Sequence, residues 1–191
     1  KTLKMKYFLQ LLALIILFNG CQKATKTFSE HEVSIVPKPN KMVLAEGSFA
    51  FTKDTKILIT NKNQKPAANY VSDLFKNAAG FAISVSEDEK NANFIFEENS
   101  NLKPEAYQLK VTQNKITIAA NDAAGYFYGV QTIRQLLHAS IEKTNSTEKN
   151  WVIPNISIND APRFAWRGMH MDFSRHFFSI ENVKTFLNYM A

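Results

Sequence analysis

The residues of this sequence that could do chemistry gather in its last forty positions. Residues 166–172 predict a strand that carries polar side chains among apolar ones, and a loop over 173–178 follows it. Ionisable side chains in this stretch could pair with one another or hold the oxygen atoms of a bound molecule. They include Arg167, Asp172, Arg175 and His176.

No residue pattern in the chain is typical of a metal site. Its four histidines, His31, His138, His170 and His176, show no metal-ligand spacing with acidic residues. Cys21 is the only cysteine, so a disulfide within the chain and a cysteine-ligated zinc are both excluded. We therefore predict neither a metal nor a cofactor.

The composition is that of an ordinary globular protein. Of the 191 residues, 45% are hydrophobic and 21% are charged, which excludes wholesale disorder. The formal net charge is +6, to which Lys1, Lys4 and Lys6 contribute, and the other lysines are scattered along the chain. A nucleic-acid binder would cluster its basic residues on one face, so we predict no nucleic-acid partner.

The first twenty residues predict an export signal. Lys4 and Lys6 precede an apolar run over 7–18, which is too short to span a bilayer because a spanning helix needs about 20 residues. Cys21 follows shortly after, and the pattern resembles a bacterial lipoprotein signal, in which cleavage exposes the cysteine for lipidation. Met5 is a more natural initiator than Lys1, which suggests a sequence cut from a longer one.

This signal pattern implies a signal peptide over 1–20, a lipid anchor on Cys21 and a polar tether over 21–32. It also implies an exported protein that a lipid anchor holds at a membrane, as a periplasmic or outer-membrane lipoprotein. A plain secretory peptide with an incidental cysteine is the alternative.

Residues 33–150 predict one α+β domain, with a largely antiparallel sheet and two helices. The first helix is expected over 66–79, because its apolar residues recur every three or four positions. Pro66 suits the first turn and Gly80 suits the C-terminal cap. Strands are expected at 57–59, 81–85 and 94–96, and a hairpin at 107–118.

The second helix is expected over about 123–139, with Asp122 as its N-cap. Gly125 and Gly129 lie on its apolar face, although each glycine costs a helix about 1 kcal/mol relative to alanine. Such glycines make sense where a helix lies close against a sheet. The aromatic run over 126–128 is interpreted as core and interface packing rather than as a ligand-stacking surface.

Residues 151–191 are expected to be the beginning of a second domain. Ser179 can cap a helix after the loop, with Val183, Phe186, Leu187 and Met190 on its apolar face. One strand and one helix cannot bury their own apolar faces. We therefore expect the protein to continue beyond residue 191.

One long motif begins near the junction of the two predicted domains. Residues 160–177 resemble the pattern D-x-P-R-F-x-x-R-G-x-x-x-D-x-x-R-H-F, with which the catalytic barrel of glycoside hydrolase family 20 begins. This is the family of the β-N-acetylhexosaminidases. Residues 35–39, 105–109 and 125–137 resemble parts of that family's N-terminal domain, so the resemblance covers about 33–191. It implies that residues 151–191 form the first strand and helix of a truncated (β/α)8 TIM barrel.

The resemblance also implies an exo-β-N-acetylhexosaminidase that removes terminal GlcNAc or GalNAc from glycans with retention of configuration. In this family the 2-acetamido oxygen of the sugar attacks the anomeric carbon and forms an oxazolinium intermediate. A glutamic acid protonates the leaving oxygen, and the preceding aspartate orients the acetamido group. That Asp-Glu pair lies downstream of the motif, so the chain as given is expected to be inactive. The acid pairs Glu97-Glu98 and Asp88-Glu89 are interpreted as surface residues.

For the site, the resemblance implies that Arg167 holds the ring hydroxyls of the non-reducing sugar, since a guanidinium fork suits two vicinal oxygens. Asp172, Arg175 and His176 match the motif. They are expected to fix the loop after the first barrel strand through an ion pair and hydrogen bonds, with substrate contact as the alternative. Arg163 is interpreted as a domain-interface residue.

Two other functions stay open. The first predicted domain is long enough to fold alone, which is compatible with a non-catalytic, lipid-anchored carbohydrate-binding or assembly module. A related glycosidase with an altered substrate, such as a lacto-N-biosidase, would also fit the retained Arg167.

Overall fold

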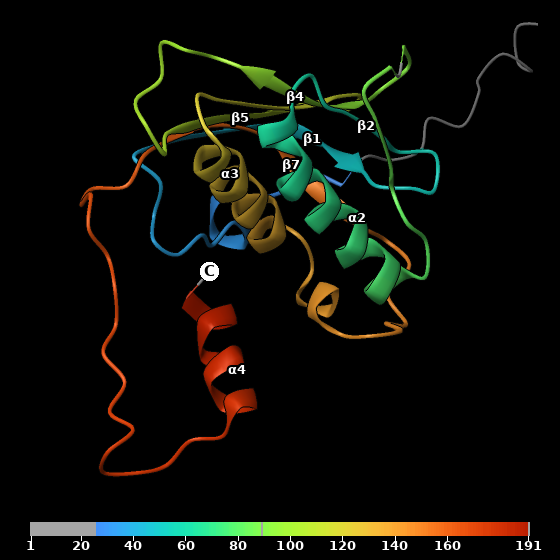
Figure 1. The fold of residues 1–191 in the computed structure, drawn as a ribbon. Helices are drawn as coiled ribbons and strands as arrows, with labels where there is room; N and C mark the ends of the chain where they lie inside the picture. Colours follow the sequence, from blue (N-terminus) through green and yellow to red (C-terminus); the bar gives the residue numbers. More distant parts are fainter. Residues whose placement is uncertain (1–25, 89, 191) are drawn as a thin grey trace, which may run out of the picture. The chain divides into compact units, whose positions relative to one another are not determined.

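The structure is a computed structural model that describes residues 26–88 and 90–190. The chain divides into two compact units, one ending at Ala161 and the other beginning at Pro162. The first unit is a sheet with helices, and the second is an irregular segment followed by one helix (Figure 1). The predicted signal over 1–20 and the predicted lipidation site Cys21 lie outside the described residues.

Seven strands of the first unit form one sheet. They are β1 (Lys41–Ala50), β2 (Lys56–Leu58), β3 (Ser84–Ser86), β4 (Phe94–Glu98), β5 (Tyr107–Val111), β6 (Ile116–Ala120) and β7 (Val152–Asp160). Their order in the sheet is β1-β7-β5-β6-β4-β2-β3. The α+β prediction is confirmed, but the sheet is mixed rather than largely antiparallel. Three pairs of neighbours in it are parallel, β2 with β3, β2 with β4 and β4 with β6. Helix α2 (Lys65–Ala79) is the crossover between the parallel strands β2 and β3.

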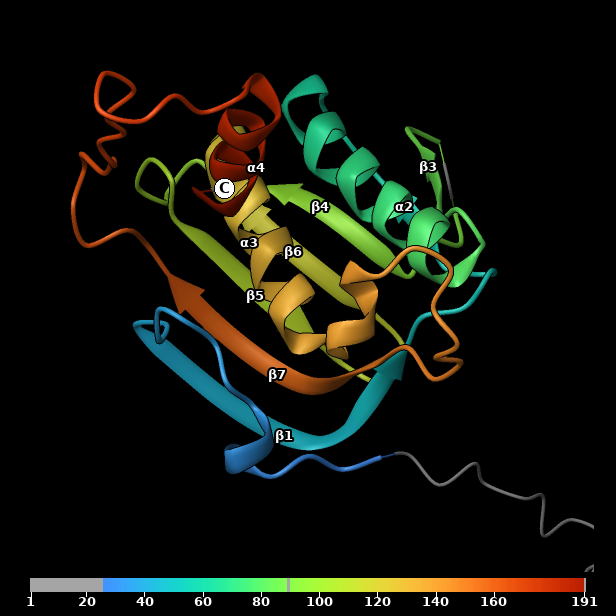
Figure 2. The ribbon, with the colours of Figure 1, turned by 90° about the horizontal axis from the view of Figure 1, so that it is seen from below.

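Helices α2 (Lys65–Ala79) and α3 (Ala123–Leu136) lie over the same face of the sheet, as Figure 2 shows. The prediction of α2 is confirmed to within one residue. Its proline lies in the first turn, and Gly80 ends the helix in the left-handed conformation at φ 77°. Val71 and Phe75 on its inner face are fully buried. The described residues of this unit also form three short 3-10 helices: η1 (Glu30–Glu32), η2 (Lys62–Gln64) and η3 (Ala139–Glu142).

The prediction that α3 packs closely on the sheet is confirmed. A Cβ atom added at Gly125 would lie 2.5 Å from the carbonyl oxygen of Ala106, and one at Gly129 would lie 2.8 Å from a methyl group of Ile118. The predicted cap is also present, since the Asp122 carboxylate accepts a hydrogen bond from the Gly125 amide at 2.8 Å. The helix ends three residues earlier than predicted, because Leu137 is already extended and η3 begins soon after.

The core of the first unit lies between the helices and the sheet. It is rich in aromatic side chains from distant parts of the sequence. Phe75 of α2 lies with its ring centroid 4.7 Å from that of Phe51 and 5.9 Å from that of Trp151. Phe94 and Phe96 of β4 stack on each other at 5.1 Å. Burial alternates along β5, so one face of that strand belongs to the core and the other is exposed.

Strand β7 extends the first unit beyond its predicted end. The sequence assigned residues 151–191 to the second domain, but β7 pairs with β1 on one side and with β5 on the other. Lys41 faces Asn159 in the first pairing, and Tyr107 faces Asp160 in the second. The first unit therefore runs to Ala161.

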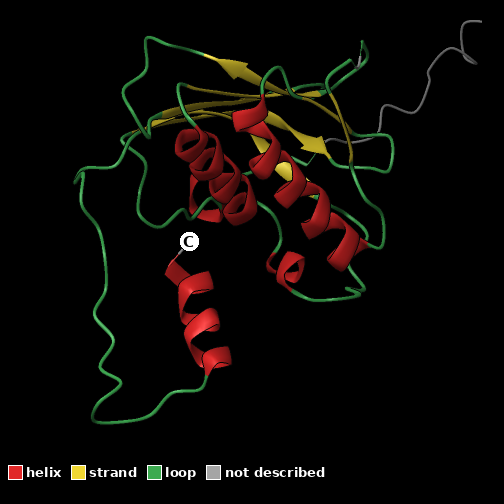
Figure 3. Cartoon of the chain, viewed as in Figure 1, coloured by secondary structure: helices red, strands yellow, loops and turns green. Residues whose placement is uncertain are grey.

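The second unit contains helix α4 (Ile180–Met190), which confirms the helix predicted there. The Ser179 hydroxyl oxygen accepts a hydrogen bond from the Asn182 amide at 3.3 Å, as expected of an N-cap. Residues 162–179 are irregular and are drawn as loop in Figure 3. The strand predicted over 166–172 does not form, because a strand needs hydrogen-bonded neighbours and the described part of this unit offers none.

Candidate functional site

Arg167, the predicted substrate ligand, lies in the irregular segment of the second unit. Its side chain is exposed, and its guanidinium donates a hydrogen bond to the carbonyl oxygen of Phe164, three residues earlier. The bond ties the arginine to the backbone of the same motif. The contact of Arg167 with a sugar stays a prediction.

Asp172 and Arg175 come together as an ion pair, with 3.4 Å between Arg175 Nε and Asp172 Oδ2. The other carboxylate oxygen of Asp172 accepts the backbone amides of Ser174, at 2.8 Å, and of Arg175, at 3.3 Å. Asp172 therefore holds the turn that follows it, which is the kind of contact expected of a loop-fixing residue. His176 is exposed beyond this turn. Substrate contact by these three residues is an untested alternative.

A second set of polar contacts lies where the chain leaves the sheet. Asp160 ends β7, and its Oδ1 accepts the backbone amide of Asn40 at 3.0 Å. The Asn40 side chain donates in turn to the carbonyl oxygen of Ala161 at 3.0 Å. The two residues thus bracket the last peptide bond of the first unit. Sequence reasoning missed this clamp, because no local pattern pairs positions 120 residues apart.

Tyr107 supports the same position from inside the domain. Its hydroxyl lies 2.5 Å from the hydroxyl of Thr132 and 3.5 Å from Oδ2 of Asp160. Burial raises the pKa of Tyr107 to about 12, and the nearby Asp160 carboxylate adds to the rise against the opposing bond from Thr132. The phenol therefore keeps its proton at neutral pH and can donate to these oxygens.

Tyr126 confirms the interpretation of the aromatic run as packing at that position. It is 1% exposed, and the Gln64 side-chain amide donates to its hydroxyl at 3.1 Å. The hydroxyl also lies 3.0 Å from the Ala120 carbonyl oxygen, at the end of β6. Burial is the main cause that raises the pKa of Tyr126. This tyrosine joins α3 to the sheet and has no face open for a ligand.

The neighbouring acids of β4 lie on the surface, as interpreted from the sequence, and contact different residues. Glu97 lies 3.8 Å from the ammonium of Lys115, whereas Glu98 accepts a hydrogen bond from the side chain of Asn61 at 3.2 Å. Both carboxylates are exposed. Of the other acid pair, Asp88 is exposed and Glu89 lies outside the described residues.

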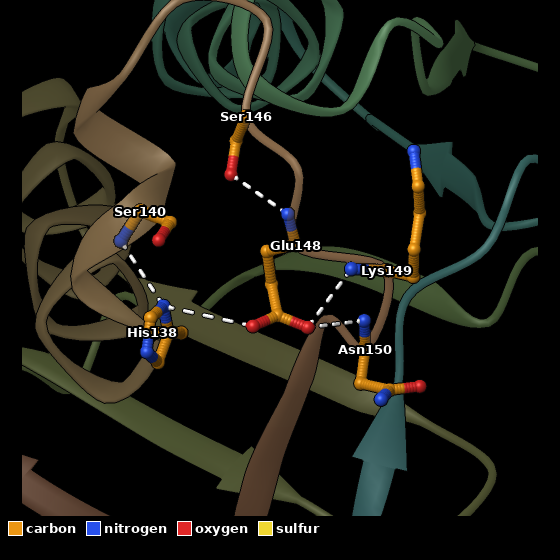
Figure 4. A network of polar contacts seen from close by, with 6 residues as sticks. All are labelled: His138, Ser140, Ser146, Glu148, Lys149 and Asn150. Atoms are coloured by element: carbon orange, nitrogen blue, oxygen red, sulfur yellow. Dashed lines mark hydrogen bonds and ion pairs between the residues drawn. The ribbon is translucent and has the colours of Figure 1, made fainter.

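A network of polar contacts orders the loop between η3 and β7 (Figure 4). The Glu148 carboxylate accepts the backbone amides of Asn150 and Lys149, at 2.7 and 2.8 Å, and these bonds hold its pKa below the usual range. Ser146 accepts the Glu148 amide at 3.0 Å, and the Nδ1 atom of His138 lies 3.9 Å from the carboxylate. The network is a structural feature of the loop rather than a catalytic constellation.

Replacing Glu148 by glutamine should lower the melting temperature at neutral pH, and the difference from the unmodified chain should shrink on acidification. The pKa of this carboxyl is lower in the folded than in the unfolded chain. Its contribution to stability is therefore present above the unfolded pKa and is lost as the pH falls through the folded one. Melting temperatures of both proteins between pH 7 and pH 2 measure the effect. A difference of constant size over that range would contradict it.

Residues 26–88 and 90–190 hold neither a metal-binding cluster nor a membrane-spanning helix. No group of three or more His, Cys, Asp or Glu side chains in this part of the chain is placed to hold a metal ion. Within the same residues, no helix is long and apolar enough to cross a membrane.

Both units match known sequences. The sequence model of glycosyl hydrolase family 20, domain 2, matches residues 32–161, and that of the catalytic domain of the same family matches residues 164–191. A β-hexosaminidase of Porphyromonas gingivalis is 31% identical over 83% of this chain and 21% of its own length. A β-hexosaminidase of Vibrio furnissii is 30% identical over 83% of this chain and 24% of its own length.

Solved structures give the same result. The family 20 β-N-acetylhexosaminidase of Streptomyces coelicolor is 31% identical, with a TM-score of 0.76 over 83% of this chain and 32% of that one. The family 20 exo-β-N-acetylglucosaminidase of Vibrio harveyi, solved in complex with N-acetylglucosamine, is 30% identical, with a TM-score of 0.72. It is matched over 87% of this chain and 24% of its own. The chain thus spans about a fifth to a third of the length of these relatives.

Proposed function

The chain belongs to glycoside hydrolase family 20, and from this we propose that the natural protein containing it is an exo-β-N-acetylhexosaminidase. The observation that carries the proposal is the match of both units, in the right order, to domain 2 and to the catalytic domain of one family. Arg167 lies in the part that matches the catalytic domain. The substrates are terminal, non-reducing GlcNAc or GalNAc residues of glycans.

The proposed reaction is retaining and assisted by the substrate. The 2-acetamido oxygen attacks the anomeric carbon as the bond to the leaving oxygen breaks, and a glutamic acid gives its proton to that oxygen. Water then attacks the anomeric carbon and gives a proton to the glutamate, the bond from that carbon to the acetamido oxygen breaks, and the acetamido group is restored. The family's Asp-Glu pair for these steps lies downstream of the motif in residues 160–177. Within the chain, Arg167 has the role of holding the sugar ring.

Hydrolysis by the natural protein of two aryl glycosides that differ at one position tests the proposal. We expect turnover of 4-nitrophenyl N-acetyl-β-D-glucosaminide and none of 4-nitrophenyl β-D-glucoside, because the second sugar lacks the attacking acetamido oxygen. Proton NMR of the first product should show the β-anomer. If neither glycoside is cleaved and calorimetry shows that GlcNAc oligomers bind, the protein is a non-catalytic carbohydrate-binding module and the proposal of an enzyme is wrong. Release of a disaccharide alone would favour the related glycosidases.

We further propose that the protein is exported as a periplasmic or outer-membrane lipoprotein, which a lipid on Cys21 anchors to a membrane. The support is the sequence pattern of residues 1–21. Replacing Cys21 by serine should move the protein from the membrane pellet to the soluble fraction and abolish its labelling by radioactive palmitate. Unchanged fractionation would contradict the anchor.

A further inference from the structure

We propose that the face of the sheet opposite the helices carries a second glycan-binding site, which holds an N-acetyl group of a polymeric glycan in a hollow over Ser157 of β7. This inference rests on the proposed function, because the ligand is the same class of N-acetylated glycan. The site belongs to the first unit alone and uses no residue of the segment that carries Arg167.

The hollow lies over one cross-strand row of the sheet. Ser157 of β7 faces Val43 of β1 on one side and Lys110 of β5 on the other. Helices α2 and α3 cover the opposite face (Figure 2), and along β5 the exposed residues, Lys110 among them, alternate with buried ones. Because residues opposite each other in neighbouring strands point to the same face, the short serine leaves a gap between two longer side chains. The volume of the hollow is about 210 Å³.

A β-bulge in β1 brings Asn155 into the lining of the hollow. The register of β1 against β7 shifts between Leu44 and Ser48, and the Asn155 side-chain amide donates to the carbonyl oxygen of Glu46 at 2.7 Å. Gly47 has a φ angle of 90°, and a Cβ atom there would lie 2.8 Å from Asn155 Nδ2. The bulge and the asparagine thus fit closely together. Bulges are common beside binding sites, where they change the direction of a side chain.

Asn155 offers an acceptor that the protein itself does not use. The residue is 9% exposed, and its Oδ1 atom is buried without a hydrogen-bond partner among the described residues. Burial of an acceptor without a donor is unfavourable, so such atoms are rare in folded proteins. Asn155 lines the hollow together with Val43 and Ala45. A ligand that brings an N–H group into the hollow would supply the missing donor.

An acetamido group has the three properties that this lining requires. Its methyl group would lie against Val43, which is 53% exposed, and Ala45. Its N–H would donate to Oδ1 of Asn155, and its carbonyl oxygen would accept from the ammonium group of Lys110, which is exposed and also lines the hollow. A carboxylate would satisfy Lys110 but has no donor for Asn155, and a hydroxyl group has no methyl for the apolar wall.

Ser157→Tyr in the natural protein tests the inference, because the added ring would fill the hollow from an exposed strand position. The affinity for colloidal chitin, an insoluble polymer of GlcNAc, should fall about tenfold, since the polymer loses one of its two points of attachment. Cellulose has the same backbone without the acetamido groups, and it should bind weakly to both proteins. The kinetic constants for 4-nitrophenyl N-acetyl-β-D-glucosaminide should stay within about twofold, because a single sugar cannot occupy both sites at once.

Thr117→Tyr is the matched control. Thr117 stands opposite Lys110 on β6, so it belongs to the same row and the same face, but it does not line the hollow. The same ring at this position should leave chitin binding unchanged. If Ser157→Tyr does not fold, Lys110→Ala takes its place, at an exposed position where removal of the ammonium group should also weaken chitin binding.

Three outcomes would overturn the inference: unchanged chitin binding in the folded Ser157→Tyr or Lys110→Ala protein, an equal loss in Thr117→Tyr, or equally tight binding of cellulose and chitin by the unmodified protein. Failure of the proposed function gives a different result. In that case the unmodified protein does not cleave the aryl glycoside, whereas its chitin binding still depends on Ser157.

Discussion

Arg167→Ala in the natural protein should reduce kcat/KM for 4-nitrophenyl N-acetyl-β-D-glucosaminide by about 10²–10⁴-fold. Each hydrogen bond from a charged group contributes about 1.5–3 kcal/mol, and the guanidinium fork is proposed to make two of them to vicinal hydroxyls. A factor of ten in rate corresponds to about 1.4 kcal/mol. Initial rates over a range of substrate concentrations measure the loss.

Arg167→Lys keeps the charge but not the fork, so its activity should lie between those of the alanine variant and the unmodified protein. Arg134→Ala is the control for loss of an arginine. That side chain pairs with Glu142 of η3, within the first unit, and its removal should leave kcat/KM within about twofold. An Arg167→Ala protein with unchanged kinetics would remove this arginine from the site.

Gly125→Ala should lower the free energy of unfolding of the first unit by about 3 kcal/mol. The new methyl group would lie 2.5 Å from the carbonyl oxygen of Ala106 and 2.9 Å from the Cβ of Ala120. The oxygen is a backbone atom and the Ala120 Cβ is bonded directly to the backbone, so neither can move aside alone and α3 must shift away from the sheet. The gain in helix propensity, about 1 kcal/mol, is too small to offset this. Denaturant unfolding followed by circular dichroism measures the change.

Gly129→Ala provides the comparison within the same helix. Its added methyl group would meet Cγ2 of Ile118 at 2.8 Å, but this contact is with a side chain, which can shift further than the backbone carbonyl that Gly125 faces. The expected loss is about 1 kcal/mol. A Gly129→Ala variant that is less stable than Gly125→Ala would contradict the distinction between backbone and side-chain contacts.

Local signals predicted the two helices of the first unit well. Periodic apolar residues, the proline at the start and Gly80 at the end define α2, and Asp122 caps α3. All of these features act within one or two turns of helix, so they can be read from the sequence alone. The close packing of α3 could also be predicted, because Gly125 and Gly129 lie one turn apart on the apolar face and leave that face without side chains at both positions.

The strands were predicted less well than the helices, because a strand forms only beside another strand that can lie far away in the sequence. Strand β1 was not predicted, because its sequence lacks clean alternation, and its register shifts between Leu44 and Ser48. Strand β7 was assigned to the wrong side of the boundary, because its neighbours lie far away in the sequence. Residues 166–172 carry a strand-like pattern but have no neighbouring strand among the described residues.

For the candidate site too, contacts between residues close in sequence were predicted and contacts between distant residues were not. The motif of residues 160–177 predicts Arg167 as a sugar ligand, and that role stays a prediction. The structure forms the Asp172–Arg175 ion pair expected within the motif, because those residues are only three positions apart. No sequence pattern predicted the contacts of Asn40, since its partners Asp160 and Ala161 lie about 120 residues away. Contacts of that range follow from the topology of the sheet and not from any local pattern.

The position of β1 at the edge of the sheet sets the order of events during synthesis of the protein. Among the described strands, its neighbour is β7. The first of these strands to leave the ribosome therefore cannot pair until the last one has emerged. The β5–β6 hairpin and the α2 crossover can form earlier, from contacts closer in sequence. Until residue 160 has emerged, β1 and the edge of β5 that receives β7 are both unpaired, and such edges favour association with other chains. Nascent chains that stop before β7 should therefore bind chaperones, and chains that extend past it should release them.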